Sequence, residues 1–455
     1  MQIEFVDGWP YHQPRLLVDG ISFEHTNNRG EVCLWQTGAA SRPWLRFGGL
    51  TDRIAEWVEA ACAGFPDDGI LDAQLYYDPK HLSAIATIDI GRIDDRRREE
   101  QGRIYGRWRN NGHLLELATN DKAGGNIQGR WYFAPGEPAP PRNIDDVRNM
   151  LTNSQARSLD LGLAAVDGGK GERLVLVLWE TRDGTNALTL TQRLAKGYVE
   201  VSAIETAPTD RKYLEGRAGP DFEALQEKRI LIYGAGAVGS HMAVQLAECG
   251  TGTLVLRDSE ILRPGNVVRH AASRAYIGWT KTRATEAVIQ ARVPWTKVEV
   301  GLATWNPSEI AAAVAHADVV VDATGNAGFA DMLSDICQQQ NRPLVSAALY
   351  RRGAVGRVCR QAAEADTPIR ARDVGNDARY PLIPPGDEPV IREPGCSAVV
   401  NNVPPSAVAA LAAQTVEIII DTITGTFSYD DELIEVYRPL EVAPFEHVGT
   451  MRIER

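Results

Sequence analysis

Three glycines and one aspartate stand in the pattern of a nucleotide-binding loop. Gly234, Gly236 and Gly239 follow a short apolar run at residues 229–233 and open an apolar stretch with helical spacing. Such a loop turns tightly, lets phosphate approach the backbone and directs the first amides of the helix toward it. Asp258 ends the next apolar run, where a carboxylate can accept hydrogen bonds from ribose. These four residues alone fit a nicotinamide dinucleotide as well as another nucleotide.

Four further polar residues favour a nucleoside triphosphate. Asn266, Arg269 and Lys281 follow the second apolar run, and Asp322 ends a later one. Cations beside a glycine loop can neutralise a triphosphate, and a carboxylate at a strand end can hold Mg²⁺. Taken singly, the two cations can be surface residues, and Asp322 can cap a following helix. The joint placement favours the triphosphate site.

The elements that must position these residues alternate regularly along the C-terminal half of the chain. We predict strands at 229–233, 252–256, 298–302, 318–322 and 343–346, and helices at 237–249 and 281–292. Apolar strands that alternate with helices are typical of a mostly parallel sheet covered on both faces. Ligands of such sheets bind at the carboxyl ends of the strands, where the polar residues stand. The predicted fold class is therefore α/β, with a Rossmann-like, doubly wound sheet in a domain at 206–455.

Two smaller domains are expected before it, because 455 residues with 44% apolar content exceed one ordinary domain. We predict a short α+β domain at 1–75, whose helix has one apolar face. That face comprises Phe47, Leu50, Ile54, Trp57, Val58 and Ala61. A mixed linking domain at 76–205 would follow, with strands at 84–90 and 173–179. Its proline-rich stretch at 135–141 indicates a further boundary near residue 142.

Bulk composition argues against several classes of protein. The formal net charge of −12 disfavours a nucleic-acid partner or an anionic membrane surface. We see no apolar run long enough to span a bilayer and no signal peptide, so we predict a cytoplasmic protein without a membrane partner. The six cysteines are scattered and form no Cys-x-x-Cys pair, which predicts free thiols and no cysteine-based zinc site.

Residues 229–350 resemble the superfamily of ThiF, MoeB and ubiquitin-activating enzymes. The motifs that carry the resemblance are Gly234-Ala-Gly236, Asp258-Ser-Glu260, Asn266-Val-Val-Arg269, Gly278-Trp-Thr-Lys281 and Val321-Asp322-Ala-Thr. The resemblance implies an adenylating enzyme that uses ATP and Mg²⁺. By the same resemblance Asp258 binds ribose and Asp322 holds Mg²⁺. The phosphates are handled by Asn266, Arg269 and Lys281.

The resemblance also implies substrates and an assembly. Members of the superfamily join AMP to the C-terminal glycine carboxylate of a ubiquitin-like or sulfur-carrier protein, and they are commonly homodimers. An upstream arginine often reaches the γ-phosphate, and Arg211 and Arg217 lie at a suitable position without the usual motif. The usual Asp-x-x-Asp-Asn run is loosened here, which leaves the role of Asn326 open. Many sulfur-carrier members hold zinc through two Cys-x-x-Cys pairs, and this chain lacks them.

The N-terminal segment resembles a ubiquitin-conjugating domain. An aromatic-proline stretch at 9–14 leads to His25-Thr-Asn27, then to Gly30-Glu-Val-Cys33-Leu34 and to Trp44. The tripeptide departs from the usual His-Pro-Asn, and the unit is short. The side-chain amide of Asn27 can stabilise the oxyanion that forms when a lysine attacks a thioester on Cys33. The alternative is a plain strand–loop–strand with a buried cysteine.

A second cysteine suits acyl transfer because an acyl-adenylate is readily attacked by a thiolate. Cys396 follows a proline- and glycine-rich stretch and precedes a helix predicted to begin near Pro405. The alternative is a small residue that packs against that helix. The patterns around Cys249, Cys337 and Cys359 are those of helices and a strand, which predicts core positions.

The leading interpretation is a fused activating and conjugating protein, similar to those of bacterial antiphage defence operons. ATP and a carrier carboxylate would give an acyl-adenylate, Cys396 would take the acyl group as a thioester, and Cys33 would pass it to a lysine of a protein target. One alternative is an adenylyltransferase that activates a sulfur carrier or a small substrate without a conjugating step. The others are a nicotinamide-dependent dehydrogenase and a scaffold without catalysis.

Overall fold

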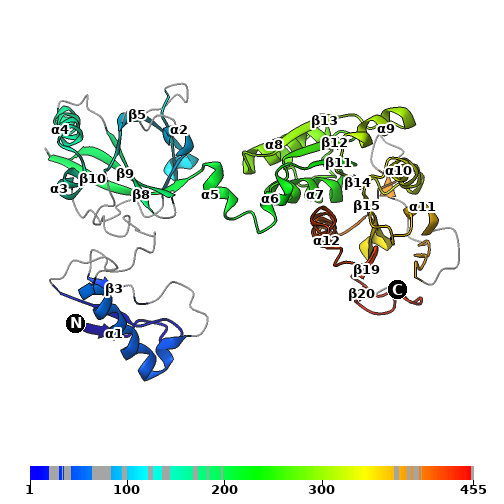
Figure 1. Ribbon diagram of the computed structural model, residues 1–455, viewed down its shortest axis with the longest axis horizontal. Helices are drawn as coiled ribbons and strands as arrows, with labels where there is room; N and C mark the ends of the chain where they lie inside the picture. The colour runs from blue at the N-terminus through cyan, green and yellow to red at the C-terminus, as the bar shows by residue number, and fades with distance from the viewer. Residues whose placement is uncertain are drawn as a thin grey trace. The chain divides into compact units, whose positions relative to one another are not determined.

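The computed structural model describes two compact units, Met1–Tyr213 and Leu214–Arg455 (Figure 1). The described residues are 1–19, 30–32, 34, 42–63, 84–94, 100–120, 127–135, 144–167, 173–181, 184–195, 198–372, 379–386, 391–392, 399–400 and 402–451. Each unit has its own sheets and its own buried cores. The predicted domain limits at residues 75 and 205 stay predictions.

The C-terminal unit is built on an eight-stranded sheet, whose first five strands in spatial order are parallel. They are β13 (Lys297–Gly301), β12 (Thr253–Arg257), β11 (Arg229–Tyr233), β14 (Val319–Asp322) and β15 (Leu344–Tyr350). Three antiparallel strands extend the sheet: β16 (Val355–Gln361), β19 (Glu432–Val436) and β20 (Gly449–Met451). The predicted α/β class and mostly parallel sheet are confirmed, whereas the antiparallel extension was not predicted.

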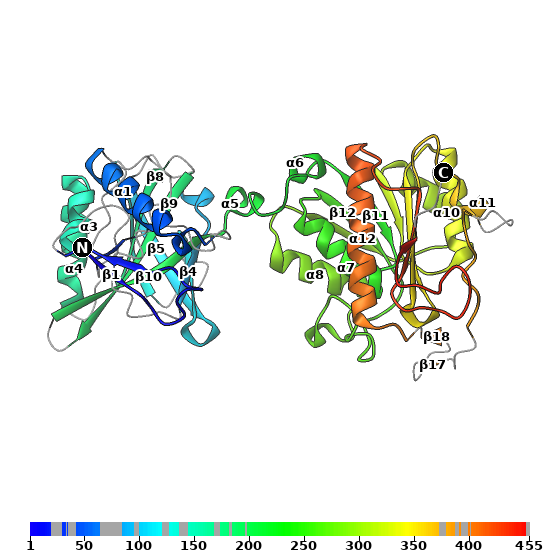
Figure 2. The ribbon, with the colours of Figure 1, turned by 90° about the horizontal axis from the view of Figure 1, so that it is seen from below.

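Helices cover both faces of this sheet because its strands are apolar on both sides. One face carries α7 (Ala237–Glu248), α8 (Lys281–Arg292) and α12 (Pro405–Thr424), and Figure 2 shows α12 beside α7. The other carries α9 (Pro307–Ala315), α10 (Ala327–Gln339) and α11 (Ile369–Arg372). In β11, Ile230 and Ile232 pack toward the first face, and Leu231 and Tyr233 toward the second. Burial on both faces is typical of parallel sheets.

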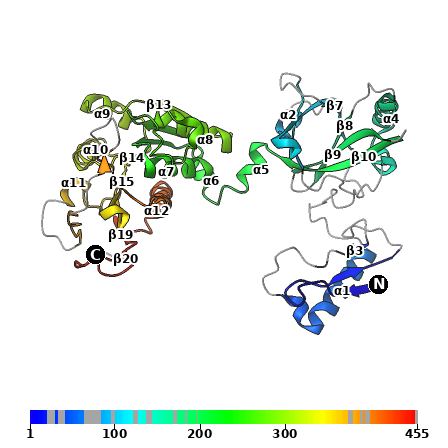
Figure 3. The same cartoon turned by 180° about the vertical axis from the view of Figure 1, so that it is seen from behind.

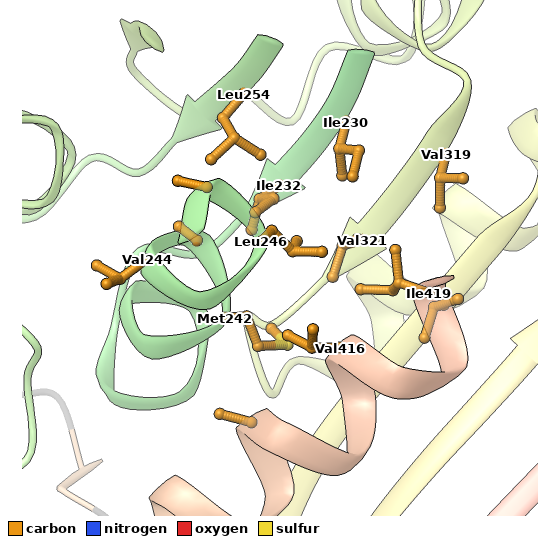
Figure 4. Close-up of a cluster of buried hydrophobic side chains, with 14 of the residues drawn as sticks. Ile230, Ile232, Met242, Val244, Leu246, Leu254, Val319, Val321, Val416 and Ile419 are labelled. Carbon is orange, nitrogen blue, oxygen red and sulfur yellow. The ribbon is translucent and has the colours of Figure 1, made fainter. Parts of the chain in front are cut away.

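The core between α7, α12 and the sheet is continuous (Figure 4). Its labelled side chains come from two helices and three strands: Ile230, Ile232, Met242, Val244, Leu246, Leu254, Val319, Val321, Val416 and Ile419. The loops of this unit also contain short elements: α6 (Phe222–Leu225), η6 (Arg274–Tyr276), η7 (Arg351–Gly353), and the pair β17 (Ile391–Arg392) and β18 (Val399–Val400). The packed helices and strands form the base under the loops at the carboxyl ends of the strands.

The structure corrects the expectation that no apolar run is long enough to span a bilayer. Among the described residues, α12 passes that test by its length and composition alone. However, 61% of its 18-residue apolar window is buried inside the protein, against β15, β16 and α7. A helix buried in a core needs the same composition.

The N-terminal unit contains a closed barrel of seven strands, in the order β10-β4-β6-β5-β7-β8-β9. Their bounds are β4 (Ile85–Ile88), β5 (Gln101–Arg109), β6 (Leu114–Ala118), β7 (Ile127–Phe133), β8 (Leu174–Thr181), β9 (Gly184–Ala195) and β10 (Tyr198–Pro208). The predicted boundary near residue 142 is wrong, because β7 pairs directly with β8 across it. A connector rich in proline indicates exposure, but it does not show whether the strands on its two sides pair.

Both faces of β8 are buried, which explains its unbroken apolar sequence. Leu174, Leu176 and Leu178 pack in one core of the barrel. The residues between them face the other way and pack in a second core, which two helices cover. Those helices are α3 (Ile144–Met150) and α4 (Asn153–Asp167), and Figure 3 shows α4 beside β9 and β10. Shorter elements in and beside the barrel are α2 (Gly91–Asp94) and η4 (Asn110–Gly112), and α5 (Arg211–Glu215) follows β10.

The first residues form a three-stranded antiparallel sheet with one helix. The elements are β1 (Gln2–Glu4), β2 (Arg15–Leu17), β3 (Glu31–Val32), η1 (Pro43–Leu45) and α1 (Phe47–Ala63). Of the residues predicted to form the apolar face of α1, Trp57 belongs to a buried core cluster, and Leu50, Ile54 and Ala61 pack against that cluster. Val58 is 39% exposed, so its assignment to that face was wrong. The indole Nε1 of Trp44 donates to the Pro10 carbonyl at 3.0 Å.

Candidate functional site

The glycine loop runs from the end of β11 into α7, as predicted, and its three glycines have different roles. Gly234 has φ +90°, and a Cβ there would lie 2.7 Å from the Ala323 carbonyl oxygen. A Cβ on Gly239 would lie 1.8 Å from the Gly234 carbonyl oxygen. A Cβ on Gly236 would meet no atom within 4 Å. Gly234 and Gly239 are therefore required by conformation or packing, whereas Gly236 borders open space.

Asp258 follows β12 and is bonded to the glycine loop. Its Oδ2 accepts from the Ala235 amide at 2.8 Å, and its Oδ1 accepts from the Glu260 amide at 2.7 Å. The Gly234 amide is also used internally, on the Arg257 carbonyl at 2.8 Å. An ionised carboxylate has about four acceptor positions, so Asp258 retains capacity for a ribose hydroxyl. The amides that remain for phosphate are those at the start of α7, which have no acceptor within the helix.

Asn266 organises the turn that carries Arg269. Its Oδ1 accepts from the Arg263 amide at 3.0 Å, and its carbonyl accepts from the amides of Arg269 and His270 at 2.9 and 3.0 Å. The structure thus shows a backbone role for Asn266. The predicted contacts of Asn266 and Arg269 with phosphate stay predictions.

Lys281 is the first residue of α8, and it is 8% exposed. Its Nζ forms an ion pair with Glu260, whose side chain is largely exposed. Its amide donates to the Glu260 carbonyl at 2.9 Å, and Thr280 caps the helix by accepting from the Arg283 amide. The ammonium is therefore held by Glu260, whose amide donates to Asp258 and whose carboxylate solvent can reach. A phosphate oxygen could replace this carboxylate.

His270 is a buried residue of the site that the sequence did not reveal. Its ring Nε2 lies 2.8 Å from the Ala235 carbonyl oxygen, and its Nδ1 accepts from the Ala272 amide at 3.0 Å. These partners assign the proton to Nε2. Burial, with a smaller contribution from Lys281, lowers the pKa of His270 to about 4. The only signal in the sequence is a histidine directly after Arg269, which does not indicate a partner 35 residues away.

Asp322 ends β14 and is 2% exposed. Its Oδ1 accepts from the amide and hydroxyl of Thr324 at 3.0 and 2.7 Å, and its Oδ2 accepts from the Ser346 hydroxyl at 2.9 Å. Burial raises the pKa of Asp322, so a cation at the carboxylate would favour its ionised form. Oriented carboxylate oxygens are the chemistry that Mg²⁺ requires, and Mg²⁺ in nucleotide sites commonly uses one or two carboxylates with substrate phosphates. The residue therefore fits the predicted ion.

The alternative in which Asp322 caps a helix is wrong. The N-cap of α10 is Asn326, whose Oδ1 accepts from the Phe329 amide at 3.1 Å. The position that the loosened motif left open therefore has a structural role.

The predicted residues meet at the carboxyl edge of the parallel strands. Ala235 is bonded to Asp258 and to His270, and Asp258 accepts from the amide of Glu260, the residue that pairs with Lys281. On the other side of β11, Tyr233 is the register partner of Asp322. The structure thus places Asp258, Lys281 and Asp322 around one loop, while their contacts with ligand stay predictions.

The predicted roles of several other residues stay predictions. Cys33, Asn27 and Cys396 lie outside the described residues. Arg211 and Arg217 are exposed, and their role stays a prediction. The predicted core positions of Cys337 and Cys359 are confirmed, Cys249 is half-buried, and Cys62 is exposed.

Comparison with known proteins agrees with this architecture. A model of the ThiF family matches residues 210–440, just over half of the chain. "Adenylyltransferase and sulfurtransferase MOCS3-2" of Zea mays is 30% identical over 45% of this chain and 42% of its own length. "SAMP-activating enzyme E1" of Haloferax volcanii is 30% identical over 34% of this chain and 57% of its own. "Molybdopterin-synthase adenylyltransferase" of Escherichia coli is 32% identical over 28% of this chain and 52% of its own.

The chain thus spans less than two thirds of the length of each of these curated relatives. The match of the family model covers the whole parallel part of the sheet and every residue of the nucleotide motifs. The chain therefore belongs to the ThiF family.

Proposed function

We propose that the chain is an ATP-dependent adenylyltransferase that activates the C-terminal carboxylate of a ubiquitin-like or sulfur-carrier protein. The observation that carries the proposal is the arrangement of Asp258, Lys281 and Asp322 around a glycine loop that is open at Gly236. The glycine loop and Asp258 would also suit a nicotinamide dinucleotide, whereas Lys281 and Asp322 add a cation and a buried carboxylate that favour a triphosphate with Mg²⁺. Two of the relatives are named adenylyltransferases, and a third is named an activating enzyme, which supports the same chemistry.

The proposed first step is displacement at the α-phosphorus of ATP. A carboxylate oxygen of the carrier attacks this phosphorus, the bond to the β-phosphate oxygen breaks, and pyrophosphate leaves while AMP stays joined to the carboxyl group. Positive charge must be present where phosphate charge develops. The start of α7, Arg269 and Lys281 would supply it, and Asp258 would accept hydrogen bonds from ribose. For this contact Lys281 exchanges Glu260 for a phosphate oxygen.

Asp322 would hold Mg²⁺ through a carboxylate that Thr324 and Ser346 orient. The ion would supply a concentrated positive charge beside the phosphates. The two hydroxyl donors fix the direction of the carboxylate oxygens before any ligand arrives.

The finer part of the proposal concerns the acyl group. The Cys396 thiolate attacks the carbonyl carbon of the acyl-adenylate, AMP leaves, and a thioester forms. A second exchange moves the acyl group to Cys33, and a lysine of a protein target attacks it there while the Asn27 amide stabilises the oxyanion. The sequence contexts of the two cysteines support this route, and so does the relative named "SAMP-activating enzyme E1".

A second candidate ends at adenylation or at sulfur transfer, without conjugation. The names "sulfurtransferase" and "Molybdopterin-synthase adenylyltransferase" among the relatives favour it. Both candidates share the ATP step and differ in whether a carrier thioester forms on this chain.

One experiment separates the two candidates. ATP–pyrophosphate exchange is measured with candidate carrier proteins, and non-reducing gels then follow labelled carrier on wild type, Cys396→Ala and Cys33→Ala. Cys62→Ala, which removes an exposed cysteine of α1, is the matched control. We expect exchange in all four proteins and loss of the thioester band only in Cys396→Ala. Exchange without any thioester supports the second candidate, and the absence of exchange with every carrier contradicts both.

A further inference from the structure

The glycine loop is bonded to a segment of the chain that is distant in sequence, and His270 makes the central contact. We infer that His270 is a positioning residue that orients the Ala235–Gly236 peptide, and thereby the Gly236 amide, for nucleotide phosphate. This inference deepens the proposed function and rests on it, since it concerns the same nucleotide site.

The planarity of the peptide bond turns one hydrogen bond into an orientation. The carbonyl of Ala235 and the amide of Gly236 belong to one peptide plane, and in a trans peptide they point in opposite directions. The His270 Nε2–H holds the carbonyl at 2.8 Å from the buried side. The Gly236 amide is therefore directed away from the core. A Cβ at Gly236 would meet no atom within 4 Å, so the space beside this residue admits a ligand.

The loop needs such a restraint because glycines stand on both sides of Ala235. Glycine reaches backbone conformations that other residues avoid, so the two adjoining peptide planes can rotate at low cost. Asp258 holds the first plane through the Ala235 amide at 2.8 Å, and His270 holds the second plane through the Ala235 carbonyl. With both planes held, the orientation of the Gly236 amide is set before nucleotide binds, and the entropic cost of binding falls.

Two neighbouring contacts extend the restraint to Arg269. The Ser240 hydroxyl of α7 accepts from the Ala271 amide at 3.1 Å. The ring of His241, also in α7, hydrogen-bonds the backbone of Arg269. Together with the His270 contact, these bonds tie residues 269–271 to the start of α7. The two groups predicted to bind phosphate, the Gly236 amide and the Arg269 side chain, are therefore carried by one bonded unit.

The variant His270→Leu tests the inference because it removes the donor and keeps an apolar side chain of similar bulk. A buried carbonyl without a partner is costly, and the peptide plane is released. We expect the ATP dissociation constant to rise on the order of 10-fold. The KM for ATP in pyrophosphate exchange should rise similarly, with a smaller change in kcat. His270→Gln, whose amide nitrogen can reach the position of Nε2, should restore most of the affinity.

Val314→Ala is the matched control for general destabilisation. Val314 is buried in α9 on the opposite face of the sheet, and its truncation leaves a cavity away from the loop. We expect its ATP dissociation constant to stay within about twofold of wild type, since a lost buried methyl pair acts on stability. A His270→Leu protein that also stays within twofold would overturn the inference. So would a His270→Gln protein as weak as His270→Leu.

Hydrogen exchange separates failure of this inference from failure of the proposed function. The bonded amides of the peptide 234–241 include Gly234 on the Arg257 carbonyl, Ala235 on Asp258 and Ser240 on the Gly236 carbonyl. Without nucleotide, His270→Leu should exchange faster in this peptide than Val314→Ala does. Equal exchange overturns the inference. Wild-type protein that binds no ATP overturns the proposed function, and the exchange result still decides whether His270 orients this peptide.

Discussion

At the scale of single residues, two glycines of the same loop are needed for different reasons. Gly236 leaves space for the ligand, and Gly239 allows the loop and α7 to pack closely. Gly236→Ala adds a methyl group into open space, so the fold should persist while the approach of phosphate is blocked. Gly239→Ala places a methyl carbon 1.8 Å from the Gly234 carbonyl oxygen, which the backbone cannot accommodate without moving. We expect Gly239→Ala to lose about 3 kcal/mol or more of unfolding free energy. Gly236→Ala should lose about 10-fold or more in ATP affinity, while its unfolding free energy stays within about 0.5 kcal/mol of wild type.

Urea unfolding and ATP titration of the two variants check this pair. Gly236→Ala with unchanged ATP affinity would contradict the assignment of the phosphate to this side of the loop. A stable Gly239→Ala protein would show that the loop and α7 can separate.

Burial of His270 makes stability depend on pH. Its pKa in the folded protein is about 4, below the ordinary value of 6.5, so the unfolded chain takes up the proton first. Its contribution to stability is therefore complete above pH 6.5 and is lost as the pH falls toward 4. We expect this residue to lower the unfolding free energy by about 3 kcal/mol across that window. The pKa of His241 is also lowered by burial, and it acts in the same direction.

Wild type and His270→Gln are unfolded in urea at pH 7.0 and pH 4.5. Hydrogen exchange of peptides from β11 follows the unfolding and gives the unfolding free energy of each protein at each pH. Carboxylates titrate in both proteins, so they cancel in the comparison. The unfolding free energy should change less with pH in His270→Gln than in wild type. Equal changes in the two proteins would contradict a neutral, buried ring.

At the scale of elements, the unpredicted antiparallel strands are joined to the core by buried charges. Glu432 of β19 binds Arg357 of β16 at 2.7 Å and also pairs with Arg372 of α11 at 3.4 Å. Arg360, on the same strand as Arg357, pairs with Asp366 and Asp421 at 3.0 and 3.2 Å. Charges buried in this way are costly unless they are paired, so the strands, α11 and α12 must assemble together.

Removing one member of this network should be far more damaging than removing a surface pair. Glu432→Leu leaves two buried guanidinium groups short of a partner, and we expect a loss of about 3–5 kcal/mol in unfolding free energy. Asp335→Ala breaks the exposed pair with Arg370 and should cost less than about 1 kcal/mol. Denaturant unfolding of both variants at neutral pH measures the contrast, and similar losses would contradict it.

Two residues of the nucleotide motifs, Thr280 and Asn326, are the N-caps of helices. In α8 the cap is Thr280, and in α10 it is Asn326, each accepting a backbone amide of the first turn. The helices therefore begin directly beside Lys281 and after Asp322. Thr280 therefore sets the start of α8 at Lys281, whereas the position of Asp322 is set by the end of β14.

At the scale of the whole molecule, the nucleotide site and the barrel belong to different units. The C-terminal unit has cores of its own on both faces of its sheet, and the family match begins at residue 210. We expect a fragment of residues 210–455 to fold and to keep ATP–pyrophosphate exchange with a carrier that the full chain accepts. It should lose any transfer that depends on Cys33.

Circular dichroism and the exchange assay on the fragment test this expectation, with the full chain carrying Cys33→Ala as the matched control. An unfolded fragment would show that the first unit supplies part of the core. A folded fragment without exchange would place part of the reaction in residues before 210.

Much of the C-terminal unit was predictable because its signals are local. Strand β11 and helix α8 have the predicted bounds, and Asp258 and Asp322 lie at strand ends as expected. The apolar periods and the glycine spacing are properties of neighbouring residues, and they are strong in a parallel sheet. The barrel was not predicted, because its closure joins β10 to β4, and no local pattern indicates that pairing.

The amino-acid sequence by itself determined the strand–helix order of the nucleotide unit and the residues that converge at its edge, since both follow from short-range patterns. Only the tertiary structure decided which atoms those residues engage. It showed that Asp258 bonds the amide of Ala235 and that His270 bonds its carbonyl. It also showed that Glu260 forms an ion pair with Lys281 and that α12 is a core helix. Such contacts join residues far apart in the chain, and they are set by packing and by the cost of leaving buried polar groups unpaired, which local sequence does not encode.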